Sequence, residues 1–234
     1  MNTRKDFLLT TGLLALAPAA ANAARKTPAK AAPRPELTFT FDRARFEQIL
    51  GKPARHKQCF GATAIAGGGV MFSMKNSIGA YEDYLKEPAG SMQAVAVLYH
   101  GASISLAMSD SVWNGLFTPL FRNKPFLDQL PLPQRDDITQ LALGKGNPFL
   151  RSMTNDPDDV SVERLVSKGS AFFVCHNAIA GFARVIADVV KEHPQKVHAA
   201  MMAGIVPGAL AVPAGVMAIN ACQEAKFTYI QSSL

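Results

Sequence analysis

The sequence predicts a three-layer α/β sandwich with a mostly parallel sheet. Short apolar runs rich in β-branched and aromatic residues recur along the chain and fit strands buried on both faces, most clearly at 92–99 and 171–174. Each run passes through a polar or glycine-containing turn into a segment with apolar residues at helical spacing. Such alternation of strands and helices is typical of a parallel sheet covered by helices.

The first 23 residues have the pattern of an export signal peptide. Arg4 and Lys5 precede an apolar run at 7–17, and small residues then lead to an A-x-A type cleavage site ending at Ala23. The run is too short for a stable membrane span. The start is similar to a twin-arginine signal in which Lys5 replaces the second arginine, so export by the Tat or the Sec machinery stays open. We therefore expect a periplasmic protein.

Residues 24–41 form a predicted linker rich in alanine, proline and basic residues, and 42–234 form a single domain. The formal net charge is +6, to which residues 1–23 contribute +1 and residues 24–35 contribute +4. The body of the chain is therefore almost neutral, which argues against nucleic acid as a partner. For the basic linker, a solvated tether is favoured over a membrane contact.

The first half of the domain alternates between strands and helices. Residues 38–41 predict a short strand, and Asp42 is placed to cap a helix that runs to Leu50. Residues 59–65 predict a strand that enters a triple-glycine turn. Because this turn lacks both common phosphate-loop patterns, we interpret it as a flexible connection to the next helix.

A predicted strand at 92–99 and helix at 102–113 lead into an insertion at about 114–160. The insertion holds six prolines and four phenylalanines. A long irregular segment of this kind fits a lid, a partner surface or a packed loop. For its aspartates, loop and helix-cap roles are favoured over a metal site, because no spacing matches a calcium loop. A helix at 161–168 follows the insertion.

The C-terminal part continues the same alternation. A strand at 171–174 passes into a helix that His193 and Pro194 are expected to end. A strand at 209–212, a Pro-Ala-Gly turn, another helix and a terminal strand at 227–230 complete the domain.

Cys175 directly follows the strand at 171–174, where the chain passes into a helix. Ligands bind at this edge of open α/β sheets, and a helix N-terminus favours a thiolate. The alternative is a cysteine that merely fills space. His100 follows the strand at 92–99 and would reach the same edge, where it could polarise a thiol or bind an anion. Its alternative is a hydrogen-bonded turn residue.

Other chemistries lack support in the sequence. Three cysteines, Cys59, Cys175 and Cys222, cannot all pair with one another, and an odd cysteine in an exported chain indicates a free thiol or an intermolecular bond. There is no C-x-x-C motif, no zinc-type spacing and no G-x-S-x-G motif. We therefore expect neither a metal nor a cofactor.

The chain resembles the DsrE/DsrF-like family in three strings: LYHGASISL, NPFLRSM…LVSKGSAFFVCHNAI and VPGALAVPAGVMAINACQEAKFTYI. The resemblance covers residues 57–234. It implies a flavodoxin-like α/β fold, assembly into trimers or hexamers and, in some members, a cysteine that carries sulfur as a persulfide. Cys175 matches the family's cysteine after the buried strand. The insertion at 114–160 is longer than in small sulfur-relay subunits, and export separates this chain from a cytoplasmic relay.

The leading hypothesis is a periplasmic DsrE-like protein that binds or carries a small sulfur species, as a persulfide on Cys175. In it, Cys175 is the nucleophile, and His100 and His176 tune or orient it. The candidate ligand-binding positions lie in the turns at the same edge: Gly101, Asn177, Ala178 and Pro213. The competing hypothesis is a non-catalytic ligand-binding or oligomeric scaffold protein with an inert cysteine, so enzymatic activity stays open.

Overall fold

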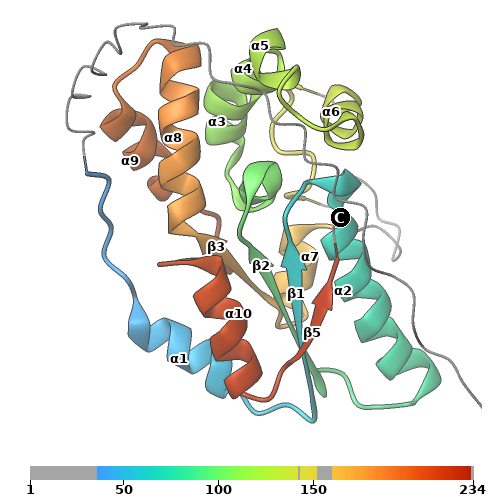
Figure 1. Ribbon diagram of the computed structural model, residues 1–234. Helices are drawn as coiled ribbons and strands as arrows, with labels where there is room; N and C mark the ends of the chain where they lie inside the picture. The colour runs from blue at the N-terminus through green and yellow to red at the C-terminus, as the bar shows by residue number, and fades with distance from the viewer. Residues whose placement is uncertain (1–35, 142, 152–159, 233–234) are drawn as a thin grey trace, which may run out of the picture. The chain divides into compact units, whose positions relative to one another are not determined.

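The computed structural model describes residues 36–141, 143–151 and 160–232. The expected export signal at 1–23 and most of the predicted linker lie outside these ranges, as does part of the insertion. The described domain is an α/β sandwich of three layers, with helices on both faces of one sheet (Figure 1). This confirms the fold class that the alternating strand and helix patterns predict.

The sheet has five strands in the order β4-β3-β2-β1-β5, and every pair is parallel. From the N-terminus they are β1 (His56–Ala62), β2 (Met92–Leu98), β3 (Ala171–Cys175), β4 (Ala209–Val212) and β5 (Thr228–Gln231). All residues of β2, β3 and β4 are buried. Their continuous apolar sequences follow from this burial, because helices cover both sides of the strands.

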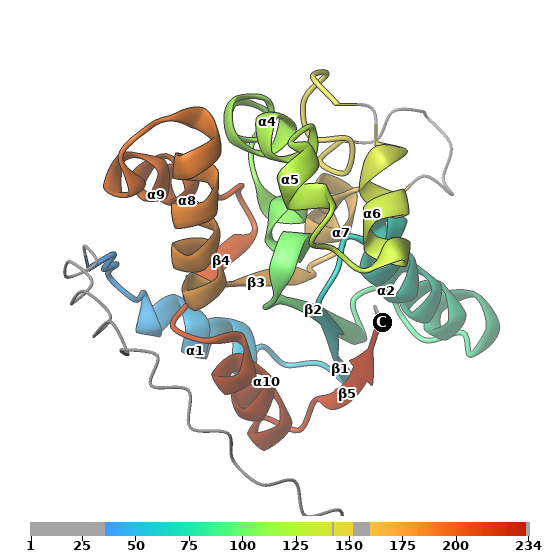
Figure 2. The same ribbon diagram turned by 45° about the horizontal axis from the view of Figure 1, so that its top comes forward.

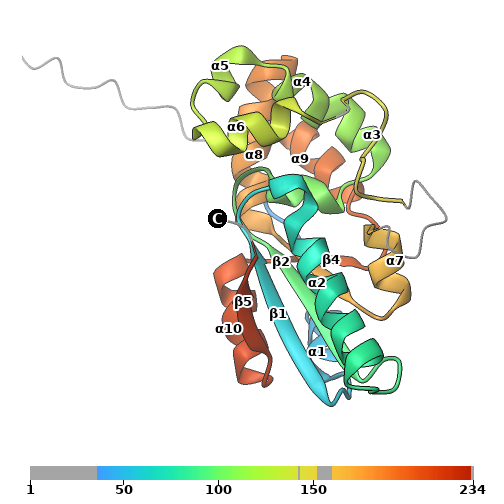
Figure 3. The ribbon, with the colours of Figure 1, turned by 90° about the vertical axis from the view of Figure 1, so that its right-hand side faces the viewer.

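Helices of two groups form the outer layers (Figures 2 and 3). The sheet has a hydrophobic core on each face. The helices that pack against the larger core are α2 (Gly69–Gly79), α7 (Val162–Ser167), α8 (His176–Val190) and α9 (Pro194–Ala203). The helices on the opposite face are α1 (Arg43–Gly51) and α10 (Gly215–Glu224). Successive strand residues alternate between the two cores, so Phe172 faces the first group, whereas Phe173 packs on Phe46 of α1 with ring centroids 4.9 Å apart.

Local sequence signals place several helix boundaries correctly. The Asp42 carboxylate accepts a hydrogen bond of 2.9 Å from the Arg45 backbone N–H and caps α1, as predicted. Ser161 caps α7 in the same way, accepting from the Arg164 backbone N–H at 3.1 Å. Gly169 follows α7 with a φ of +88°, a conformation that favours glycine at a helix end.

Three predicted elements are wrong. Residues 38–41 form no strand; instead Leu37 is buried, and Phe39 and Phe41 make aromatic contacts. The helix expected at 102–113 is a 3₁₀ helix, η3 (Gly101–Ala107), which ends at the extended residue Met108 before the short α3 (Asp110–Val112). The residues expected to end a helix, His193 and Pro194, begin α9.

The described part of the insertion contains several short helical turns and packs into the core of its own chain. Its described turns are η4 (Trp113–Phe117), α4 (Thr118–Phe121), α5 (Lys124–Leu127) and α6 (Leu132–Thr139). Trp113, Phe117 and Phe121 are almost fully buried, and the Phe117 ring lies 6.4 Å from that of Phe182 on α8. These aromatic residues therefore need no second subunit to cover them.

An aspartate of the insertion holds the triple-glycine turn. Gly67 and Gly68 have φ angles of +56° and +82°, which explains why glycine stands here. The backbone N–H of Gly67 donates a hydrogen bond of 2.6 Å to Oδ1 of Asp137 on α6. The turn is therefore the strand-to-helix connection that the sequence predicts, and Asp137 stabilises a loop.

Candidate functional site

Cys175 lies where neighbouring strands send their connections to opposite faces of the sheet. It is the last residue of β3 and pairs in register with Val212, the last residue of β4. After β3 the chain enters α8 on one face, and after β4 it enters α10 on the other. In open α/β sheets, a switch of this kind is where ligands bind.

The Cys175 side chain is buried at the start of α8. Cys175 is the N-cap residue of the 15-residue helix α8, and no side-chain hydrogen bond caps that helix within the described ranges. The residue is only 4% exposed. Its backbone position therefore suits a reactive thiol, whereas a reagent would need local opening to reach the sulfur.

The other two cysteines are neighbours in the core on the α1 and α10 face of the sheet. Cys59 of β1 and Cys222 of α10 are both fully buried. A hydrogen bond with the Cys222 thiol, followed by burial, raises the pKa of the Cys59 thiol far above its usual range. Cys59 is therefore held as a neutral thiol, and Cys175 is the cysteine without such a neighbour in the described part of the chain.

A pair of buried histidines lies next to Cys175. His176, the first residue of α8, and His198 of α9 have their Nε2 atoms 2.9 Å apart, and both residues are less than a tenth exposed. One ring must donate and the other accept in this hydrogen bond, which requires both to be neutral or to share one added proton. Phe39 stacks on the His176 ring with centroids 4.1 Å apart.

The sequence hypothesis included His176 but missed His198. It missed His198 because it predicted no helix at 194–203. One signal was present: Val197 and Met201 are four residues apart and both buried, so they mark the inward side of α9, next to His198. The structure therefore pairs His176 with His198, and no contact between His176 and the thiol is among those it shows.

His100 and Cys175 reach the same edge of the sheet, because β2 and β3 are adjacent and parallel. The His100 side chain is exposed and makes no hydrogen bond within the described ranges; its backbone carbonyl accepts from the Ser103 hydroxyl at 2.7 Å. Gly101 follows with a φ of +53°, which favours glycine. Asn177 is exposed, whereas Ala178 and Pro213 are half-buried.

The pKa values of both paired histidines are lowered. Burial, and then the charge of His198, lower the pKa of His176; burial, and then the Arg184 guanidinium, lower that of His198. The unfolded chain therefore binds protons at a higher pH than the folded chain. Folding stability must then fall as pH falls through the ordinary histidine value of about 6.5.

We predict that replacing His198 reduces this pH dependence. Between about pH 7 and about pH 5, the free energy of unfolding should fall less steeply in His198→Gln than in the wild type, because one buried group no longer titrates. Urea unfolding at several pH values measures the slope. His100→Gln, at an exposed histidine, is the control and should keep the wild-type slope. Equal slopes in all three proteins would contradict the prediction.

The site holds no described set of metal ligands. Among residues 36–141, 143–151 and 160–232, no group of three or more histidine, cysteine or acidic side chains is arranged to bind a metal ion.

Comparisons of the chain with protein-family models, with curated proteins and with solved structures found no match. Functional conclusions must therefore come from the residues and their geometry.

Proposed function

We propose that this protein is an exported DsrE-like protein that binds or carries a small sulfur species as a persulfide on Cys175. The observation that carries the proposal is the position of Cys175, at the end of β3 where the connections of β3 and β4 diverge. Cys59 and Cys222 are buried next to each other in the core as free thiols, which further supports Cys175 as the functional cysteine.

The proposed step is a transfer of sulfane sulfur. The Cys175 thiolate attacks the outer sulfur of thiosulfate, forming a new S–S bond to the cysteine. The S–S bond of thiosulfate breaks, and sulfite leaves with the electron pair of that bond. No oxidant or reductant is consumed, because the sulfane sulfur only changes its partner. The backbone N–H groups of Asn177 and Ala178 in the first turn of α8 would stabilise the anionic product.

We expect the wild-type protein to gain the mass of one sulfur atom after exposure to thiosulfate, measured by intact-protein mass spectrometry. Cys175→Ser should abolish the gain, because serine is similar in size but cannot form the persulfide. The matched control is Cys222→Ser, which makes the same chemical change at a cysteine with no proposed role and should retain the gain. Sulfur uptake by Cys175→Ser would refute the assignment.

The same proposal predicts selective alkylation. Cys175 should react with iodoacetamide faster than Cys59 or Cys222 at neutral pH, because those two are fully buried. His100→Ala should slow the reaction without abolishing it. Asn177→Ala should leave the rate unchanged, since the backbone N–H remains and the side chain is exposed.

The competing function is a non-catalytic ligand-binding or oligomeric scaffold with an inert cysteine. The low exposure of Cys175, 4%, favours it, as does the Phe39 ring stacked on the adjacent His176. Equal and slow alkylation of all three cysteines in the folded protein would select the scaffold over the carrier.

Periplasmic location and homo-oligomeric assembly are part of the proposal. The signal-like pattern at 1–23 supports export by Tat or Sec. No helix in the described ranges is long and apolar enough to cross a membrane. Assembly as a trimer or hexamer is supported by the resemblance of residues 57–234 to the DsrE/DsrF-like family.

A further inference from the structure

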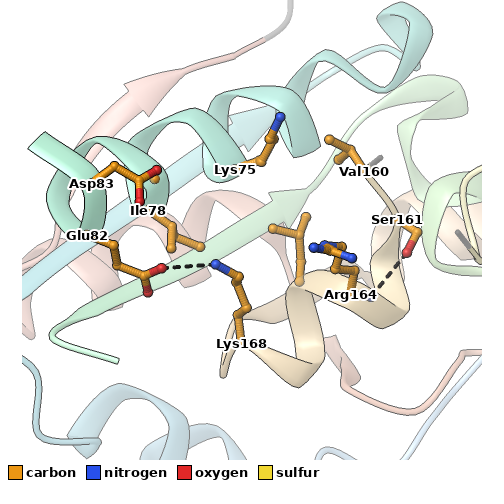
Figure 4. Close-up of a pocket in the computed structure, with 10 residues that line it drawn as sticks. Lys75, Ile78, Glu82, Asp83, Val160, Ser161, Arg164 and Lys168 are labelled. Carbon is orange, nitrogen blue, oxygen red and sulfur yellow. Dashed lines mark hydrogen bonds and ion pairs between the residues drawn. The ribbon is translucent and has the colours of Figure 1, made fainter. Parts of the chain in front are cut away.

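A small cavity lies between two helical segments far from each other in the sequence. Its volume is about 230 Å³, and it separates α2 and its extension η2 (Ala80–Tyr84) from α7. Figure 4 shows the acidic residues Glu82 and Asp83 at one end and the cationic Arg164 toward the other. Lys75, which has an interaction of its own, lines the α2 side. Ile78 and Leu165 supply apolar surface between the ends. The cavity is therefore dipolar.

Two opposite charges in this cavity, on Asp83 and Arg164, have no partner among residues 36–141, 143–151 and 160–232. The Lys168 Nζ atom reaches across from α7 to Glu82 Oε2 at 3.0 Å, so this acidic group is already neutralised. Within the described ranges, neither the Asp83 carboxylate nor the Arg164 guanidinium makes a hydrogen bond or an ion pair. A bound molecule can satisfy both only if it carries both signs of charge.

We infer that this cavity binds a small zwitterion, with its carboxylate on Arg164 and its ammonium group on Asp83. A guanidinium offers two parallel N–H donors to a carboxylate, which suits Arg164 to that end of the ligand. The volume is below the roughly 300 to 1,000 Å³ of pockets for drug-sized ligands, so the ligand is a short amino acid. This site contains none of the residues proposed for sulfur transfer.

Gly79 keeps the acidic end open. It has helical dihedral angles, φ −61° and ψ −39°, and an added Cβ would lie 3.5 Å from Asp83 Oδ2. Alanine therefore fits here without strain, but its methyl group would occupy the cavity next to Asp83. This position offers a steric probe that preserves the fold.

Isothermal titration of the full chain with amino acids of increasing length tests the inference. The series is glycine, β-alanine, 4-aminobutanoate and 6-aminohexanoate, with butanoate and butylamine as singly charged analogues. One member of the series should bind at least about tenfold more tightly than either analogue, because each lost charge removes a charge-assisted hydrogen bond. Equal affinity for butanoate, or no binding by any member, would overturn the inference.

Matched variants assign the binding to this cavity. Arg164→Gln, Asp83→Asn and Gly79→Ala should each weaken binding of the best ligand about tenfold. Arg45→Gln on α1 and Asp188→Asn on α8 make the same charge changes at exposed positions outside the cavity and should leave the affinity unchanged. Equal losses in the cavity variants and their controls would show binding elsewhere. Sulfur uptake by Cys175 should be unaffected in every variant.

Discussion

Gly215→Ala is expected to destabilise the protein by about 3 kcal/mol or to prevent folding. A Cβ built on Gly215 would lie 1.8 Å from the Cβ atom of Tyr99 and 3.0 Å from its Cα atom. Neither atom can move away by side-chain rotation, because both positions are fixed by the backbone. Overpacking of a core costs about 1–3 kcal/mol even where side chains can shift, so this change lies at the upper end.

The matched control for this change is Gly181→Ala. Gly181 is exposed in the middle of α8, and an added Cβ meets nothing within 4 Å. Because alanine is the better helix former, this variant should be more stable by about 0.5–1 kcal/mol. Urea unfolding measures both variants. A Gly215→Ala protein with wild-type stability would show that α10 does not pack on the end of β2 as the structure has it.

This contact also bears on the candidate site. Gly215 is the first residue of α10, so its packing on Tyr99 places the turn after β4 next to the end of β2. β3 lies between these two strands, and Cys175 is its last residue. A Gly215→Ala variant that still folds should therefore change the alkylation rate of Cys175, because the turn around the thiol must shift.

The strands of this fold could be predicted because burial on both faces imposes a simple pattern. β2 and β3 are continuous apolar runs; η3 follows β2 after a short turn, and α8 follows β3 directly. From these two runs alone, the edge position of His100 and Cys175 follows once the strands are adjacent and parallel. The sequence therefore carries the strands locally, whereas the common edge of His100 and Cys175 also requires the pairing of β2 with β3, which lie far apart in the chain.

The missed helices share one physical cause. Pro119, Pro125, Pro133 and Pro194 suggested irregular chain, but each stands in the first turn of a short helix. Proline is favoured there, because the first backbone N–H groups of a helix have no partner within it. The contact of His198 with His176 depended on one of these helices, so the histidine pair could not be foreseen without it.

The last large effect concerns Asn147, the first residue of the string NPFLRSM in the insertion, to which the sequence hypothesis assigns no role. Its buried side-chain amide donates to the backbone carbonyl oxygens of Leu106 at 3.0 Å and Met108 at 2.7 Å, and to Ser105 at 3.3 Å. Its Oδ1 atom accepts from the Phe149 backbone N–H at 2.9 Å. Asn147 thus provides hydrogen-bond donors to the backbone carbonyl groups at the end of η3, which have no partners in a continuing helix.

Asn147→Ala should lower the free energy of unfolding by about 3 kcal/mol, since each buried hydrogen bond contributes about 1 kcal/mol and the carbonyl groups remain buried. Asn147→Asp should be at least as harmful, although it has the same shape, because a carboxylate cannot donate to carbonyl oxygens. Asn114→Ala is the control: its exposed side chain makes one described hydrogen bond, to the Gly146 N–H, and its loss should cost about 1 kcal/mol or less. Urea unfolding compares the three variants, and a well-tolerated Asn147→Asp would contradict this account of η3.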